Sequence, residues 1–409
     1  MSSTVTVTGG NNQTVTLNYD SATNAALAQQ LAGSITAGVT AGTIVPSTNA
    51  VPPLPPGTTG AFFQTVSSAV AGPFTLTPGY KDAVVTAPVS ALYGSGDQGE
   101  SVLSDSGTAL TFIATGGSGT VVAGGGGDRI VIPGTDSGDW SINLGNGVNQ
   151  VLAQGSGNDS ISAGPGQNSI LLGSGDDTVT STGHDVITAT DGKETVYAAG
   201  SASDVVRGGS SDLVFFGGSG NATILGGTGS DTFFGSSGNA LVQGGSAGNN
   251  FLVAGTGAAT LFGGGDGDQL FANGGVGQQL HAGVGNETLN GGFSSGANTF
   301  YGSSGQDQII GGLGDDTVVV GSGLATVDAA LGQNTFLLVS GRSAGGSDVV
   351  QDLTSSSQIT ISLSGYTTGE ENYILATQSN TVSGTTITLT DNTTITFQNI
   401  ASITKSNFG

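Results

Sequence analysis

Two nine-residue stretches, Gly226–Phe234 (GGTGSDTFF) and Gly311–Val319 (GGLGDDTVV), show the pattern that decides the fold of this chain. Each reads G-G-x-G-x-D-x-U-x, where U is apolar, so a six-residue glycine-rich turn is followed by a three-residue segment typical of a strand. Looser copies are Gly155–Ile161 and Gly173–Val179. From about residue 123 to about residue 350 we find about 24 such units, mostly roughly 8 to 10 residues apart.

An apolar residue lies two positions after the Asp position in every unit. These residues are Ile130, Ile142, Val151, Ile161, Ile170, Val179, Ile187, Val196, Val206, Val214, Ile224, Phe233, Val242, Leu252, Leu261, Leu270, Leu280, Leu289, Phe300, Ile309, Val318, Val327, Phe336 and Val350. A three-residue strand cannot bury such a side chain alone. Stacked on its neighbours it can, so the repeat predicts an all-β solenoid with a thin continuous core.

The composition excludes several classes of partner. Among 409 residues there are 75 glycines, no cysteine, and 6 Lys and Arg against 29 Asp and Glu, which gives a net charge of −23. Nucleic-acid phosphates and acidic membrane surfaces would repel such a chain. No stretch is long and apolar enough for membrane insertion, and the first thirty residues carry no cleavable secretory signal.

The repeats resemble those of the RTX (repeats-in-toxin, hemolysin-type) calcium-binding family, and the resemblance covers more than half of the chain. It implies a right-handed parallel β-roll in which two nonapeptides make one turn. It also implies that Ca²⁺ binds between adjacent turns, through the Asp side chains and backbone carbonyls. The end of the chain resembles that of type I secretion substrates, in which an uncleaved export signal closes the sequence.

The sequences on either side of the repeats lack the nonapeptide pattern and predict other structures. Residues 4–19 predict a hairpin, and Asp20 is a candidate N-cap of the helix that follows. The predicted regions are 1–45, hairpin plus helix and a candidate assembly segment; 46–57, a Pro-rich linker; 58–122, irregular β structure; 123–350, the calcium-binding β-roll; and 351–409, an antiparallel β cap with the secretion signal.

Calcium prefers six to eight oxygen ligands, which Asp side chains and glycine-rich turns can supply. With two units per turn, the Asp positions separate into an acidic edge and a largely neutral edge carrying Asn, Ala and Gln. The candidate ligands on the acidic edge are Asp159, Asp177, Glu194, Asp212, Asp231, Asp268, Glu287 and Asp307. Those on the neutral edge are Asp185, Asp204 and Asp316, and Asp128 and Asp348 are isolated candidates. The alternative is that these residues only favour turns.

Catalytic motifs are missing from the sequence. The two histidines, His184 and His281, do not begin an H-E-x-x-H zinc motif. The G-x-S-x-G pattern occurs at Gly244–Gly248 and Gly341–Gly345, outside any strand-to-helix context. The Asp136–Trp140 stretch is a weak candidate for a carbohydrate contact. The sequence therefore predicts no enzyme.

We expect a secreted protein at the surface of a Gram-negative bacterium that folds in external Ca²⁺ and self-assembles into a filament, layer or biofilm matrix. Its expected partners are further copies of itself and, transiently, the type I secretion machinery. A cell-surface polysaccharide is a further candidate partner. The alternatives are an adhesin or ice- or glycan-binding rod, and an RTX enzyme with an unrecognised site.

Overall fold

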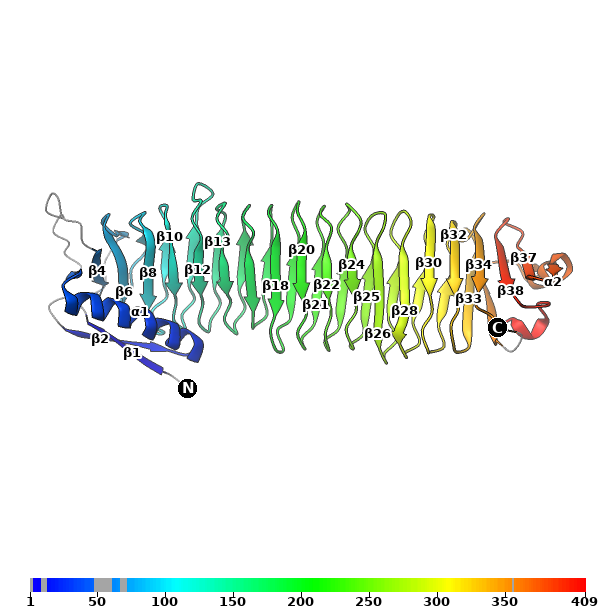
Figure 1. Cartoon of the computed structure of the whole chain (residues 1–409), viewed down its shortest axis with the longest axis horizontal. Coiled ribbons are helices and arrows are strands. Elements are labelled where there is room, and N and C mark those ends of the chain that lie inside the picture. Colours follow the sequence, from blue (N-terminus) through cyan, green and yellow to red (C-terminus); the bar gives the residue numbers. More distant parts are fainter. Residues whose placement is uncertain (1–2, 9–12, 48–60, 67–71, 355–356) are drawn as a thin grey trace. The chain divides into compact units, whose positions relative to one another are not determined.

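A computed structural model describes residues 3–8, 13–47, 61–66, 72–354 and 357–409. The chain forms two compact units, Met1–Ser210 and Ser211–Gly409. Within each unit, the strands from β4 to β35 alternate between two parallel sheets, so that each pairs with the strand two places before or after it, whereas β3 pairs with its neighbour β4 (Figure 1). The fold is the all-β parallel solenoid that the repeat predicts, with about 15 turns.

The first unit holds the earlier turns of the solenoid. We name its two sheets after the numbers that most of their strands carry. The even-numbered sheet contains β4 (Ala61–Val66), β6 (Tyr80–Val85), β8 (Gln98–Ser104), β10 (Ser118–Val122), β12 (Trp140–Asn143), β14 (Ser160–Ser162), β16 (Thr178–Ser181) and β18 (Glu194–Ala198), and β3 (Ile44–Ser47) is added to it beside β4. Its odd-numbered sheet contains β5 (Phe74–Thr75), β7 (Leu92–Tyr93), β9 (Thr111–Ile113), β11 (Arg129–Ile132), β13 (Gln150–Ala153), β15 (Ser169–Leu172), β17 (Val186–Thr188) and β19 (Asp204–Arg207). A hairpin of strands β1 (Ser3–Thr8) and β2 (Thr14–Tyr19) and the helix α1 (Ala22–Ala41) complete the described part of this unit.

The second unit shows the same alternation within itself. Its even-numbered strands are β20 (Leu213–Phe216), β22 (Thr232–Phe234), β24 (Phe251–Val253), β26 (Gln269–Gly274), β28 (Thr288–Ser294), β30 (Gln306–Ile310), β32 (Leu324–Asp328) and β34 (Ser347–Gln351). Its odd-numbered strands are β21 (Ala222–Leu225), β23 (Ala240–Gln243), β25 (Ala259–Phe262), β27 (Gln279–His281), β29 (Thr299–Tyr301), β31 (Thr317–Val319), β33 (Asn334–Val339) and β35 (Ile359–Ser364).

The core is a column of inward-pointing side chains in each sheet. In β16, Val179 is fully buried and pairs in register with Ile161 on one side and Val196 on the other. All the apolar residues predicted for the core are buried, except Val214. Its neighbour Phe215 takes the core position instead.

The solenoid begins earlier than the sequence predicted. The region 58–122 was expected to be irregular, but β6, β8 and β10 stack in register below β12. Their inward residues Ala83, Val102 and Val121 continue the column of Ile142. These turns lack the full nonapeptide pattern, yet they keep a buried apolar residue on each turn, and that residue is what the stack requires.

The hairpin and helix predicted at the N-terminus are present. Strands β1 (Ser3–Thr8) and β2 (Thr14–Tyr19) pair antiparallel, and α1 spans Ala22–Ala41. The N-cap is Ser21 and not Asp20, because Ser21 has extended backbone angles and its side chain accepts a hydrogen bond from the Asn24 backbone N–H. The helix ends at Gly42, whose φ of 73° is the left-handed geometry that favours glycine.

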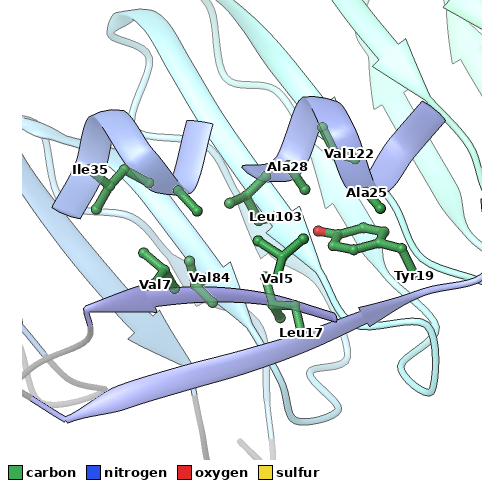
Figure 2. Close-up of a cluster of buried hydrophobic side chains, with 11 residues drawn as sticks. Val5, Val7, Leu17, Tyr19, Ala25, Ala28, Ile35, Val84, Leu103 and Val122 are labelled. Atoms are coloured by element: carbon green, nitrogen blue, oxygen red, sulfur yellow. The ribbon is translucent and has the colours of Figure 1, made fainter. Parts of the chain in front are cut away.

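The hairpin and helix pack on the first unit itself (Figure 2). Val5 and Leu17 lie in one buried cluster with Val84, Leu103 and Val122, which point outward from β6, β8 and β10. The prediction that a linker separates residues 1–45 from the following β structure is therefore wrong. The predicted linker 46–57 is also partly wrong, because residues 46–47 belong to β3, which pairs with β4; residues 48–57 lie outside the described residues.

Antiparallel strands follow the last turn of the second unit, as predicted. Strand β38 (Thr394–Gln398) pairs with β34, and β37 (Gly384–Thr388) and β36 (Ser379–Thr381) extend it antiparallel. A helix, α2 (Glu370–Thr377), and a 3-10 turn, η2 (Lys405–Asn407), complete the region. Phe408 forms an isolated bridge to Ile361 of β35, so the end of the chain also contacts the odd-numbered sheet. In the described part of the chain, no helix is long and apolar enough to cross a membrane.

Candidate metal sites

The Asp positions form two separate columns, one at the start of the even-numbered strands and one at the start of the odd-numbered strands. We call them the even column and the odd column. The even column contains Asp159, Asp177 and Glu194 in the first unit, and Asp231, Asn250, Asp268, Glu287, Asp307 and Asp348 in the second. The odd column contains Asp128, Asn149, Asn168, Asp185 and Asp204 in the first unit, and Gln278, Asn298, Asp316 and Asn334 in the second. All these side chains are buried.

One oxygen of most of these carboxylates is occupied by a hydrogen bond between turns. The Asp159 backbone N–H donates to Asp177 Oδ1 over 2.8 Å, and the Asn250 N–H donates to Asp268 Oδ1 over 2.8 Å. In the odd column the Asp185 N–H donates to Asp204 Oδ1 over 3.2 Å. The Asp and Asn side chains therefore tie each turn to the next.

The second oxygen is often without any partner. Among the described residues, the buried side-chain oxygens of the two columns that have no hydrogen-bond partner are Asp128 Oδ2, Asp185 Oδ2, Asp204 Oδ2, Asp231 Oδ2, Glu194 Oε1 and Oε2, and Glu287 Oε1. Other acids satisfy this oxygen within their own loop. Asp316 Oδ2 accepts from the Gly312 N–H over 2.7 Å, and Asp307 Oδ2 accepts from the Ser303 N–H over 2.7 Å.

These environments disfavour the charged carboxylate. Burial, followed by the charge of Asp177, raises the pKa of Glu194 to about 8. Burial and neighbouring carboxylates, Asp177 first among them, raise the pKa of Asp159 to about 7. Burial and Asp307 raise the pKa of Asp348 to about 7. At neutral pH such groups need either a proton or a cation beside them.

The glycine loops next to these columns stack so closely that backbone carbonyls line them. A Cβ on Gly157 would collide with the carbonyl oxygen of Gly138, and a Cβ on Gly175 would collide with that of Gly157. Neither Gly157 nor Gly175 has a positive φ, so close approach between turns is the reason for glycine here. A positive φ is the reason for glycine at other loop positions such as Gly192, with φ of 88°.

The arrangement fits calcium with few carboxylates per ion. Within the described residues, no three or more His, Cys, Asp or Glu side chains group closely enough to hold a metal. An ion would therefore take one or two carboxylates from a column and its other oxygens from loop carbonyls, a ligand set that calcium accepts. When bound, Ca²⁺ supplies the positive charge that the bare carboxylate oxygens lack.

Asp212 is placed one residue away from the predicted position. It is exposed, and Leu213 occupies the buried position of the even column, where its N–H donates to Asp231 Oδ1 over 3.0 Å. Asp212 Oδ1 instead accepts from the Ser230 N–H in an outer row of side chains. The physical reason is that residues 213–216 are all apolar, so burying Leu213 and Phe215 together fills the core better than burying Val214.

The two candidates that the sequence left isolated each belong to a column: Asp128 lies in the odd column and Asp348 lies in the even column. Asp128 Oδ1 accepts from the Leu110 N–H over 2.8 Å, and Asp348 Oδ1 accepts from the Ala325 N–H over 2.7 Å. Glu100 is a buried acid that sequence reasoning missed. It pairs in register with Gly119, below Trp140, and so begins the even column. The sequence does contain a signal for Glu100: the apolar Val102 follows it by two positions, the same spacing as in the repeats, and is buried.

The candidate carbohydrate contact and the candidate catalytic residues of the sequence analysis are held in packing contacts. Trp140 is buried, and its Nε1 donates to Asp136 Oδ2 over 3.2 Å, so it cannot offer its ring to a carbohydrate. His281 stacks on Tyr301 at 3.9 Å between ring centroids, and burial and the charge of Arg342 lower its pKa to about 4. Ser343, the serine of Gly341–Gly345, is fully buried between two strands, β33 and β34.

A family model of the RTX calcium-binding nonapeptide repeat matches the chain in four copies. The matched residues are 145–179, 214–240, 244–278 and 294–324. Comparison with curated proteins and with solved structures gave no match. The chain therefore carries RTX calcium-binding nonapeptide repeats, and they coincide with the stacked loops, buried acids and glycine carbonyls described above.

Proposed function

We propose that this chain is a secreted structural protein that leaves the cell unfolded, folds when it meets external Ca²⁺, and then associates with other copies of itself. RTX repeat proteins are typically secreted. The buried, partnerless carboxylate oxygens oppose folding without a cation, and metal that binds only the folded state stabilises it by mass action. Export by a type I machinery to the surface of a Gram-negative cell accords with a chain that folds only outside.

A stripe of aromatic side chains on the second unit carries the self-association part of this proposal. The stripe contains Phe216, Phe234, Phe251, Phe271 and Phe293. Neighbouring ring centroids from Phe216 to Phe271 lie 5.4, 5.8 and 5.1 Å apart. Phe234 is 37% exposed and Phe293 is 73% exposed. An exposed apolar patch of this kind marks an interaction surface.

The first unit shows how such a face is covered. The outward residues Val84, Leu103 and Val122 of its even-numbered strands lie beneath the hairpin and helix of the same chain. The aromatic stripe lies on the outward face of the even-numbered strands of the second unit. We had expected residues 1–45 to form the subunit contact, but their apolar face is buried within the first unit. The stripe is therefore the better contact surface.

A second copy of the chain is the partner we assign to the stripe. A net charge of −23 makes two copies repel each other, and bound Ca²⁺ reduces that charge. Association should therefore depend on calcium twice, through folding and through charge. A catalytic role is not part of this function, because His281 and Ser343 are held in ring-stacking and buried contacts.

Light scattering and electron microscopy, with Ca²⁺ and with chelator, test the proposal. We expect filaments or layers in millimolar Ca²⁺ and unfolded monomers in chelator. Phe234→Ser combined with Phe293→Ser should fold in Ca²⁺ but remain monomeric, whereas the control Leu331→Ser, at a residue 64% exposed, should still assemble. Equal assembly of the stripe variant would exclude this contact. A folded wild-type monomer that binds a glycan would favour the adhesin alternative.

A further inference from the structure

The last strand of the odd-numbered sheet in the second unit has one side that no other strand covers. On one side, β35 (Ile359–Ser364) pairs with β33 along its whole length. Among the described residues, no strand pairs with its other side, which we call the outer edge. An uncovered strand edge presents backbone N–H and C=O groups that can pair with another chain.

Residues 407–409, which we call the tail, lie along this outer edge. The Gly409 backbone N–H donates to the Ile361 carbonyl oxygen over 3.1 Å. Asn407 Nδ2 donates to the Ile359 carbonyl oxygen over 3.3 Å. The tail therefore covers carbonyl groups that an incoming strand would use.

The residues just before the tail are anchored independently of it. Ile403 is 2% exposed, and its backbone N–H donates to Gln378 Oε1 over 2.9 Å. Its carbonyl oxygen accepts from Gln378 Nε2 over 3.0 Å. In the tail itself, Asn407 is half-buried and Gly409 is exposed. Removing the tail should therefore uncover the outer edge and leave the packing of Ile403 in place.

Strand β35 lacks the features by which proteins protect exposed strand edges. Such strands are usually short, or carry charged residues or proline. β35 is six residues long, reads ITISLS, and contains neither a charged residue nor a proline. Its β-branched residues also favour strand pairing. By contrast, β36 has only three residues, and β3 contains Pro46. The protection of β35 therefore depends on the tail.

We propose that the tail masks a self-pairing edge, and that without the tail β35 pairs antiparallel with β35 of a second copy of the chain. Identical strands that pair antiparallel are related by a two-fold axis, so this contact closes as a dimer. At the other end of the odd-numbered sheet, β5 has only two residues and is too short to compete as the partner. The contact is distinct from the aromatic stripe, which lies on the even-numbered strands.

The backbone groups of Ile359, Ile361 and Leu363 form this contact. The carbonyls of the first two accept hydrogen bonds from the tail, and residues two apart in a strand direct their backbone groups to the same side. Ser364 directs its carbonyl to the opposite side, where it accepts from the Ser340 N–H over 2.9 Å. Leu363→Pro should therefore remove an N–H from the outer edge and leave the pairing with β33 intact.

A single fluorescent label on the full chain tests the proposal. The chain contains no cysteine, so Ser362→Cys can carry one pyrene label at a half-buried position of β35. Two labels on paired β35 strands give excimer fluorescence. In millimolar Ca²⁺, with circular dichroism to confirm folding, deleting the tail should raise the ratio of excimer to monomer emission several-fold. Adding Leu363→Pro should return the ratio to that of the full chain. The matched control Ser406→Ala keeps the tail and should leave the ratio unchanged.

The outcomes separate this edge from the stripe of the proposed function. A folded deletion variant without excimer emission would overturn the masked edge and leave the proposed function standing. Excimer emission that survives Leu363→Pro would overturn it too, because the copies would then meet through another surface. If the deletion variant does not fold, Asn407→Ala decides the question, because it removes one contact with β35 and should also raise the ratio. A wild-type chain that stays monomeric in Ca²⁺ would overturn the stripe contact alone.

Discussion

Replacing Glu194 by Gln should have opposite effects with and without calcium. Glu194 is fully buried in the even column, and both its carboxylate oxygens are without a hydrogen-bond partner among the described residues. In chelator, the substitution removes a charge that the fold tolerates poorly. In Ca²⁺, it removes a ligand. We therefore expect a more stable metal-free fold and a chain that binds fewer calcium ions.

The size of the effect follows from the pKa. Burial raises the pKa of Glu194 from 4.5 to about 8. A raised folded-state pKa means that its contribution to stability is complete below pH 4.5 and is lost as the pH rises to about 8. At pH 8 the charge costs the metal-free fold about 4 kcal/mol. Burying an unpaired amide costs roughly 1–3 kcal/mol, so the net gain for Glu194→Gln is about 1–3 kcal/mol.

The assay is urea unfolding followed by circular dichroism at pH 5 and pH 8, in metal-free buffer and in millimolar Ca²⁺. The matched control is Asp212→Asn, which also removes one negative charge but from an exposed side chain. Metal-free wild-type protein should gain β structure as the pH falls from 8 to 5, and Glu194→Gln should shift this transition to higher pH. Light scattering excludes aggregation near the isoelectric point of about 4.1.

Two results would refute this reasoning. The first is a wild-type chain that is equally β-rich at pH 5 and pH 8 without metal, because the buried carboxylates would then not oppose folding. The second is an equal change in stability for Glu194→Gln and Asp212→Asn. That result would mean that net charge, and not the burial of Glu194, controls the pH dependence.

Three further predictions concern the columns, the loops and the N-terminal segment. Asp231→Ala should lower the number of bound calcium ions. Asn298→Ala should leave that number unchanged and lower the free energy of unfolding by about 2 kcal/mol, because its side-chain hydrogen bonds are lost. An equal loss of ions in both variants would contradict the column assignment. Gly175→Ala should lower the thermal midpoint in Ca²⁺ because its Cβ meets a carbonyl of the preceding turn, whereas Gly33→Ala, with open space around it, should not. Deleting residues 1–45 should increase the binding of a hydrophobic dye in Ca²⁺, because it uncovers the outward valines and leucine of the first unit; unchanged dye fluorescence would contradict the packing of the hairpin and helix.

The sequence alone was sufficient for the repeating part of the fold. Each strand meets its neighbours about 18 residues away, so a local period determines which residues stack. The spacing from the Asp position to the apolar position predicted core residues such as Val179 and Phe300, and both are buried. The alternation of units also predicted the separation of acids such as Asp159 and Asp185 into two columns.

Only the tertiary structure decided the features that depend on packing between distant or ambiguous segments. The sequence could not place Asp212, because four consecutive apolar residues follow it and more than one register buries a hydrophobic side chain. It could not show that the hairpin and helix cover Val84 and Leu103, because that contact joins faces that are apolar for separate local reasons. Nor could it show which acids keep a bare oxygen, such as Glu194 and Glu100, because that depends on the donors that the neighbouring turn presents.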